Sequence, residues 1–112
     1  MEMMASKDKP LRSLKKHIGY CSECYCRCKH RLLTDDYDNR YFVRDVQRLH
    51  DLEYISNMNM QLEKCSKESN GFLRAYYFDE DGDKMYYESM PRTSYYRLQK
   101  KAIYEIADCL NI

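Results

Sequence analysis

The amino-terminal part of the chain carries a regular apolar pattern. Apolar residues recur from residue 11 at alternating steps of three and four: Leu11, Leu14, Ile18, Cys21, Tyr25, Cys28 and Leu32. Such steps keep one face of a helix apolar and form a heptad seam. Pro10 suits the first turn of a helix. The pattern predicts a helix over residues 10–33, and we expect residues 1–9 to form a disordered lead.

A second apolar run follows a polar break at residues 34–39. We expect a helix to begin near Asp38 or Asn39, which are good N-cap residues, and to continue to about Lys67. Its apolar line is Phe42, Val46, Leu49, Leu52, Ile55, Met58, Leu62 and Cys65. Two long amphipathic helices joined by a short break predict a helical hairpin over residues 10–69, serving packing or oligomerisation.

Residues 70–112 predict shorter elements. Asn70-Gly71 is typical of a turn or a new cap. Helices are expected after it at residues 72–78, 84–90 and 92–110, with an acidic turn at residues 79–83. The expected buried line of the last helix is Tyr95, Leu98, Ala102, Ile103, Ile106 and then Leu110. The predicted fold is all-α: a helical hairpin followed by a small carboxyl-terminal helix-turn-helix region.

Composition agrees with one small helical domain. The chain has 112 residues with three glycines and two prolines, too few for a β-sandwich or barrel with its frequent turns. A glycine-rich phosphate loop is also missing from the sequence. Apolar runs stay well short of the ~18 residues that a membrane span needs, and the amino terminus lacks an apolar signal core. We therefore expect a cytoplasmic protein without membrane contact.

The net charge of +1 hides an uneven distribution. Residues 1–33 carry eight basic and three acidic side chains, and residues 34–91 carry seven and thirteen. Residues 92–112 carry four basic and two acidic side chains. Two basic ends therefore flank an acidic middle, so the local charge says more about partners than the whole-chain value does.

A cysteine-rich stretch raises the question of a metal site. Its candidate zinc ligands are Cys21, Cys24, Cys28 and His30. Zinc sites normally pair two such dyads across a loop, and the sequence holds no second C-x-x-C. Cys21 and Cys28 already occupy seam positions, where a free cysteine packs as a small hydrophobe. We expect helix core here, with no metal and no cofactor.

Catalytic and calcium-binding signals are weak. The acidic turn at residues 79–83 lacks the glycine and glutamate spacing of an EF-hand loop. His17, His30 and His50 have no serine or cysteine at the spacing of a nucleophile and its base. We expect no enzyme activity.

The most informative stretch is residues 92–101, which carry four basic side chains and no acidic one. A short helix, a break and a basic helix with hydroxyl residues in its first turn are the parts of a helix-turn-helix. Arginine, threonine and serine of such a first turn reach base edges, while lysines further along meet phosphates. The alternative is a solvated basic face on an ordinary terminal helix.

The stretch from Pro91 to Ala107, Pro-Arg-Thr-Ser-Tyr-Tyr-Arg-Leu-Gln-Lys-Lys-Ala-Ile-Tyr-Glu-Ile-Ala, resembles the end of the ArpU/RinA-type phage transcriptional regulators. These end in a helix-turn-helix like that of sigma factor region 4. The matching block covers about residues 72–112 and departs from the family pattern at Pro91, usually serine, and Tyr87, usually alanine. The resemblance implies these DNA contacts: Arg92, Thr93, Ser94, Tyr96, Arg97, Lys100 and Lys101.

The resemblance implies a sequence-specific DNA-binding regulator of phage or phage-derived late genes, in the cytoplasm of a bacterial host. Its implied partners are double-stranded DNA, with host RNA polymerase and a second copy of the chain as further candidates. The first alternative is a small helical protein-binding adaptor or inhibitor that grips a partner with the heptad seam. The second alternative is a small zinc-stabilised domain.

Overall fold

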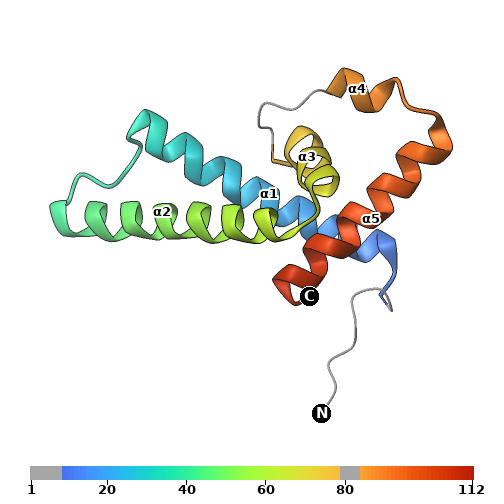
Figure 1. Cartoon of the computed structure of the whole chain (residues 1–112). Helices are drawn as coiled ribbons and strands as arrows, with labels where there is room; N and C mark the ends of the chain where they lie inside the picture. The colour runs from blue at the N-terminus through green and yellow to red at the C-terminus, as the bar shows by residue number, and fades with distance from the viewer. Residues whose placement is uncertain (1–8, 79–83) are drawn as a thin grey trace, which may run out of the picture.

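The computed structural model describes residues 9–78 and 84–112, and its described residues form an all-α fold, as predicted (Figure 1). The helices are α1 (Leu11–Thr34), α2 (Tyr41–Lys64), α3 (Lys67–Tyr76), α4 (Lys84–Glu88) and α5 (Arg92–Leu110). Residues 1–8 of the expected lead and the expected acidic turn at residues 79–83 lie outside the described residues. None of the described helices is both long and apolar enough to cross a membrane.

The two long helices pack as a hairpin, and the shorter helices gather at one end of it (Figure 1). Helix α5 crosses this end and contacts α1, α2 and α3. The other end of the hairpin, where α1 leads into α2, extends away from the shorter helices (Figure 1). The predicted boundary at residues 69/70 falls inside α3, and the buried side chains of the hairpin, α3 and α5 form one cluster.

The seam of α1 supplies much of this core. Leu14, Ile18, Tyr25 and Cys28 are buried, and the remaining seam residues are partly buried. The Tyr25 ring meets Phe78 edge-to-face at 5.2 Å between centroids, and its hydroxyl donates to Asn59 Oδ1 at 3.0 Å. Five of the seven seam residues belong to the core cluster or pack against it, all except Cys28 and Leu32. This confirms the predicted helix and the face it buries.

The predicted apolar line of α2 is wrong over its first half. Phe42, Val46, Leu49 and Leu52 are exposed, while Met58 and Leu62 of the same line are buried. The reason lies in the spacing. Three successive steps of three, from Leu49 through Leu52 and Ile55 to Met58, each fall about 60° short of a turn and together shift the line by about 180°. Helix α2 therefore carries apolar residues on two opposite faces.

The junction between α2 and α3 also differs from the expectation. Helix α2 ends at Lys64, and Asn70-Gly71 lies inside α3 rather than in a turn. The N-cap of α3 is Ser66, whose hydroxyl accepts the N–H of Ser69 at 3.4 Å. Glu105 of α5 strengthens this cap by accepting the Ser66 N–H at 2.9 Å and its hydroxyl at 3.0 Å. A carboxylate at a helix amino terminus is a favourable arrangement that ties α5 to α3.

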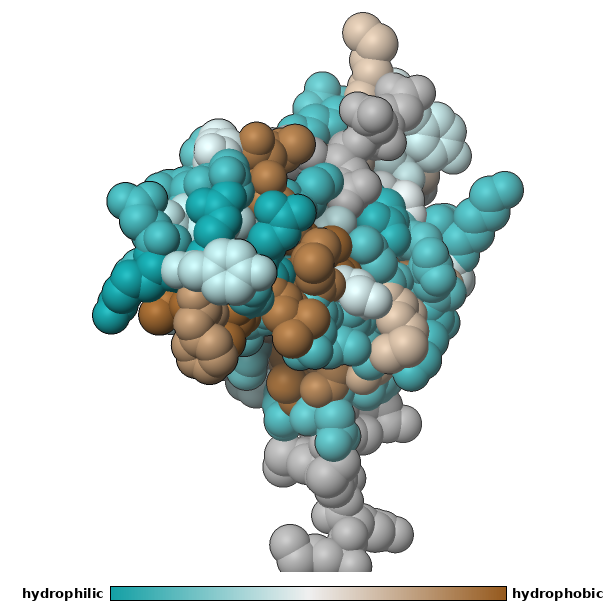
Figure 2. Space-filling view, turned by 90° about the vertical axis from the view of Figure 1, so that its left-hand side faces the viewer, coloured by the Kyte–Doolittle hydropathy of each residue, from teal (hydrophilic) through white to brown (hydrophobic). Residues whose placement is uncertain are grey.

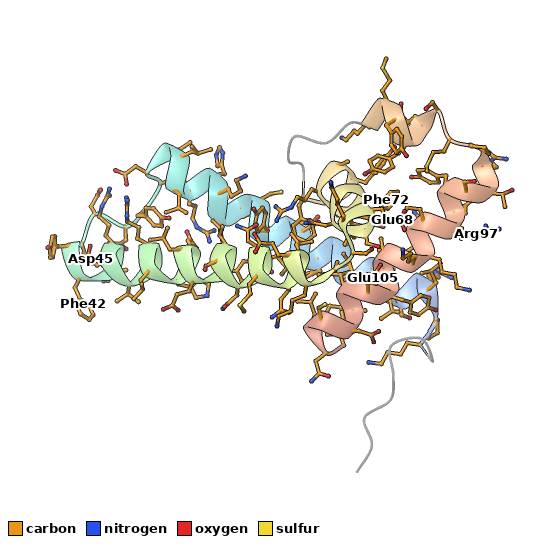
Figure 3. All side chains as sticks on the ribbon, viewed as in Figure 1. Phe42, Asp45, Glu68, Phe72, Arg97 and Glu105 are labelled. Atoms are coloured by element: carbon orange, nitrogen blue, oxygen red, sulfur yellow. The ribbon has the colours of Figure 1, made fainter. Side chains whose placement is uncertain are left out.

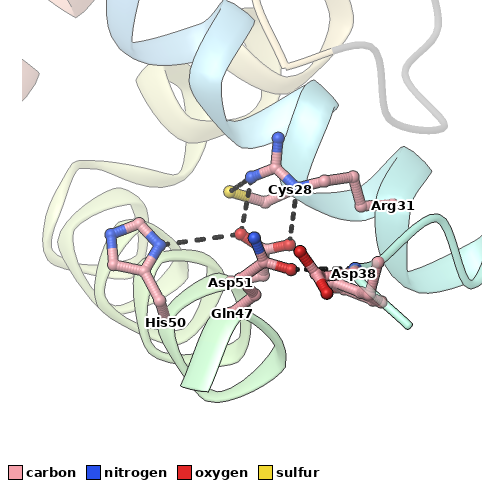
Figure 4. A network of polar contacts seen from close by, with 7 residues as sticks. Cys28, Arg31, Asp38, Gln47, His50 and Asp51 are labelled. Atoms are coloured by element: carbon pink, nitrogen blue, oxygen red, sulfur yellow. Dashed lines mark hydrogen bonds and ion pairs between the residues drawn. The ribbon is translucent and has the colours of Figure 1, made fainter. Parts of the chain in front are cut away.

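One ion pair fixes the far half of the hairpin. Asp51 of α2 is 1% exposed, and Arg31 of α1 donates to it twice, from Nε at 2.8 Å and from Nη2 at 2.6 Å (Figure 4). Tyr37, in the connection between the helices, donates its hydroxyl to the same carboxylate at 2.8 Å. His50 Nδ1 lies 3.6 Å from it. The bidentate geometry compensates for burying the charge.

These contacts shift the titration of the groups involved. The Arg31 hydrogen bonds hold the pKa of Asp51 well below its usual value. Burial, and then hydrogen bonding to Asp51, raise the pKa of Tyr37 to about 12. The same two causes raise the pKa of Cys28 to about 11. At neutral pH the site therefore holds a carboxylate, a guanidinium, a neutral phenol and a neutral thiol.

We expect Arg31→Met to lower the free energy of unfolding at pH 7 by about 1–3 kcal/mol. The loss is smaller than for a fully buried pair because Arg31 is partly exposed. The pKa of Asp51 is lower in the folded protein than in the unfolded chain, where it is about 3.9. The Asp51 charge therefore stabilises the wild type at pH values above about 3.9, and this stabilisation is lost as the pH falls toward the lower, folded-state pKa. The difference between variant and wild type should therefore narrow from pH 7 to about pH 3, as measured by urea unfolding.

The matched control is Arg27→Met, an exposed position on the same helix, where a change below about 0.5 kcal/mol is expected. An Arg31→Met loss of equal size at both pH values would contradict the role given to the Asp51 charge.

Candidate nucleic-acid interface

Helix α5 has two halves with different surroundings. In the carboxyl-terminal half, Ala102, Ile103, Ile106 and Ala107 are fully buried in the common core. The amino-terminal half extends past the hairpin beside α3 and α4 (Figure 1). Tyr95 and Leu98 hold this half to the core cluster, which confirms the predicted buried line. The last turns of this one continuous helix are therefore packed in the core, while its first turns extend from the core and expose their outer side chains.

The basic and hydroxyl side chains predicted to contact DNA lie on the outside of this half. Six of them are exposed, and Ser94 is partly buried. The six are Arg92, Thr93, Tyr96, Arg97, Lys100 and Lys101. Thr93, Arg97 and Lys100 follow one another at steps of four and three, so they share one face of the helix. Arg97 points away from the molecule (Figure 3).

The start of α5 leaves its first turn without a side-chain cap. Pro91 precedes the helix with φ −56° and ψ 143°, and its carbonyl accepts the N–H of Tyr95 at 3.0 Å. A serine in this place would cap the N–H groups of the first turn with its own hydroxyl. With proline they remain suited to a phosphate oxygen, which helix amino termini bind well.

Lys101 lies in a setting that the sequence did not indicate. Its ammonium group forms an ion pair with Glu68 of α3. The hydrogen bond to Glu68 raises the pKa of Lys101. Among the described residues, no ion pair joins Lys100 to an acidic side chain. The two lysines that looked equivalent in the sequence therefore differ in how freely they can meet a phosphate.

Aromatic rings fix α4 and the start of α5 on α3. Phe72 of α3 packs edge-to-face on Tyr87 of α4 and on Tyr95 of α5, each at 5.6 Å between centroids. Tyr76 lies 5.9 Å from Tyr87 and 5.8 Å from Tyr95. Such pairs contribute roughly 0.5–1.5 kcal/mol each beyond burial. They set the position of the basic half of α5 relative to the rest of the protein.

Tyr87, one of the departures from the family pattern, is accommodated by Gly71. A Cβ at Gly71 would lie 2.6 Å from the Tyr87 hydroxyl, too close for any real contact. The glycine that looked like a turn signal in the sequence thus allows a tyrosine, rather than a small residue, to pack between α4 and α3. It needs no positive φ to do so.

Glu88 is an acidic residue at the edge of this surface. It is exposed on α4, and a hollow of about 250 Å³ lies between it and Arg92, Tyr95 and Tyr96. Burial, and then the charges of Tyr96 and Glu88, raise the pKa of Tyr95. No sequence pattern singles out Glu88, because its distance to the basic helix depends on how α4 is placed.

The structure does not gather the candidate zinc ligands into one group. Among residues 9–78 and 84–112, no group of three or more suitable side chains could hold a metal ion. Cys28 is buried beside Arg31 and Asp51, Cys21 and Cys24 are partly buried, and His30 is exposed. Burial, and then the neighbouring Cys24, raise the pKa of Cys21. A raised pKa favours the thiol, whereas metals bind the thiolate.

Comparison with known proteins gives no relative on which to base an assignment. No family model, no curated protein and no solved structure matches the chain.

We expect Gly71→Ala to destabilise the packing of α4, because its new methyl group meets the Tyr87 hydroxyl. Tyr87→Phe removes that oxygen and should rescue Gly71→Ala. A double-mutant cycle in urea unfolding should give an interaction energy of about 1 kcal/mol or more between the two sites. Additive losses would contradict the proposed fit.

We expect the purified protein to contain no stoichiometric zinc and to melt at the same temperature with and without a chelator. A structural zinc contributes folding energy directly, so its removal would lower the melting temperature. One zinc per chain by elemental analysis, with loss of helicity on chelation, would contradict the helix-core interpretation of the cysteines.

Proposed function

We propose that this protein is a sequence-specific DNA-binding regulator that reads duplex DNA with the amino-terminal half of α5. The observation that carries the proposal is the exposed basic face of that half, whose residues 92–101 include no acidic side chain and which an anchored helix holds beyond the core (Figure 1). The order of α4, a three-residue connection and α5 supports it, since a helix-turn-helix has these parts in this order.

The side chains divide into two roles under this proposal. Arg92, Thr93, Ser94 and Arg97 are suited to base edges because they lie in the first two turns of α5. Lys100 and Lys101 are suited to phosphates. Tyr96 is exposed on a flank and could serve either role. The phage setting and host RNA polymerase as a further partner come from the sequence resemblance alone, and the proposal includes no catalytic step.

The alternative, a protein-binding adaptor that grips its partner with the heptad seam of α1, has less support. The protein's own helices bury Leu14, Ile18, Tyr25 and Cys28 of that seam. An adaptor would need a different surface.

A binding selection from random duplex oligonucleotides with the purified protein tests the proposal. We expect affinity for selected DNA to fall with salt, because each phosphate contact adds about 0.9 to the slope of log affinity against log salt. Lys100→Ala should weaken binding to all sequences alike and flatten this slope. Arg97→Ala should instead narrow the difference between selected and random DNA, by about 1–3 kcal/mol if it makes a bidentate base contact.

The Lys101 ion pair adds a sharper comparison. Because Glu68 occupies Lys101, we expect Lys101→Ala to weaken binding less than Lys100→Ala does, and Glu68→Gln to strengthen it. Lys16→Ala, at an exposed position on α1, is the control and should leave the affinity unchanged. If the wild type shows no salt-dependent affinity for any duplex at low salt, the DNA proposal fails.

A further inference from the structure

The first half of α2 exposes an apolar face that nothing in the described part of the chain covers. We call Phe42, Val46, Leu49 and Leu52 the α2 outer face; their exposed fractions are 78%, 53%, 57% and 49%. Phe42 points away from α1 (Figure 3). Seen from this end of the hairpin, hydrophobic atoms lie exposed among hydrophilic ones (Figure 2). Scattered single apolar residues are ordinary on a surface, but four on one face of one helix are not.

The position of this face follows from the fold. Asp51 turns the opposite side of α2 toward Arg31, so the outer face points outward. The shorter helices gather at the other end of the hairpin and leave this end free (Figure 1). The face is therefore a helical surface rather than a loop, which suits a helix as its partner.

We propose that the α2 outer face binds the same face of a second copy of this chain, with the two α2 helices antiparallel. The faces would be centred between Val46 and Leu49, so that Val46 of each copy meets Leu49 of the other. A two-fold interface uses one patch on both copies and must be self-complementary, which an apolar patch is. The two hairpins would then form a four-helix layer.

The exposed area is sufficient for such a dimer. Scaled by their exposed fractions, the four residues and the neighbouring Tyr41, which is 80% exposed, present roughly 600 Å². Two such faces would bury at most roughly 1,200 Å² together, the lower end of the range for specific interfaces. We therefore expect a dissociation constant in the micromolar range rather than a permanent dimer.

The charges along α2 favour the antiparallel arrangement. Asp45 and Glu53 lie on the same side of α2 as the apolar residues. Arg48 lies on the flank of this side, where its Nη1 is also 3.7 Å from Asp35 Oδ1 of the same chain. An antiparallel pair centred between Val46 and Leu49 brings Asp45 within about one turn of Arg48 of the other copy. A parallel, in-register pair would instead set Asp45 against Asp45 and Glu53 against Glu53, and like charges repel.

Sedimentation equilibrium of the full chain without DNA, over a range of micromolar concentrations, tests the proposal. We expect a reversible monomer–dimer equilibrium that Phe42→Ser and Leu49→Ser shift to monomer by at least tenfold in dissociation constant. Both residues are exposed, so the monomer should keep its fold, as checked by circular dichroism. Met85→Ser, which removes an exposed apolar side chain of α4, is the matched control and should leave the dimer intact.

A charge exchange tests the orientation. Asp45→Arg and Arg48→Asp should each weaken self-association, because each sets like charges against one another in the antiparallel pair. A mixture of the two variants should recover it, since both contacts then join opposite charges. In a parallel pair residue 45 would face residue 45, so each variant alone would keep a like-charge contact of the same kind as the wild type and would not weaken self-association. Single variants that associate as well as the wild type would therefore overturn the antiparallel arrangement.

A wild type that stays monomeric throughout this range overturns the second-copy proposal. A monomer that binds purified bacterial RNA polymerase, and loses this binding on Phe42→Ser, would also overturn it and assign the face to another partner. The measurement uses no DNA, so its failure is distinct from failure of the DNA proposal.

Discussion

The carboxylate of Asp51 decides how the second long helix is turned, and much of the surface follows from it. A buried charge without a partner costs several kcal/mol, so α2 can pack only where Arg31 meets Asp51. Met58 and Leu62 lie on the same side of α2 and enter the core together with it. The apolar residues on the opposite side are left outside. A polar contact thus chooses between two apolar faces that hydrophobicity alone does not distinguish.

Specific side-chain contacts also orient the helices at the other end of the molecule. Glu105 caps α3 from within α5, and the rings of Phe72 and Tyr76 hold α4 and the first turns of α5. These contacts join elements far apart in the sequence without any long connecting structure. The basic half of α5 is consequently fixed to the core by side-chain contacts, and under the proposed function a helix held in this way would lose little conformational freedom on binding DNA.

The sequence was sufficient where local signals and the apolar period agree. Helices α1 and α5 begin next to Pro10 and Pro91, and their buried faces match the spacing of the apolar residues. The sequence was insufficient where the same residue type is compatible with two different structures. Gly71 is a turn signal by composition, yet here it makes room for Tyr87 inside a helix. The eight apolar residues of the α2 line looked like one face because a shift of about half a turn is gradual along the chain.

In the candidate site, too, some features could be predicted from the sequence and others could not. Exposure of the basic face of α5 could be predicted, because a buried line fixes the side opposite to it. The pairing of Lys101 with Glu68, 33 positions earlier in the chain, could not, because no short-range pattern brings α3 beside α5. The acid at Glu88 and the ring contacts that place it depend likewise on tertiary packing.

The division of α5 into an anchored half and a presented half bears on how such a protein can change over evolution. Thr93, Arg97 and Lys100 contribute nothing to the core, whereas Leu98, Ala102 and Ile106, on neighbouring positions of the same helix, carry it. Exchanges on the outer face are therefore close to neutral for stability, since surface substitutions seldom exceed about 0.5 kcal/mol. If this face binds DNA as proposed, its target sequence can change over evolution while the buried scaffold stays the same, without any step that unfolds the protein.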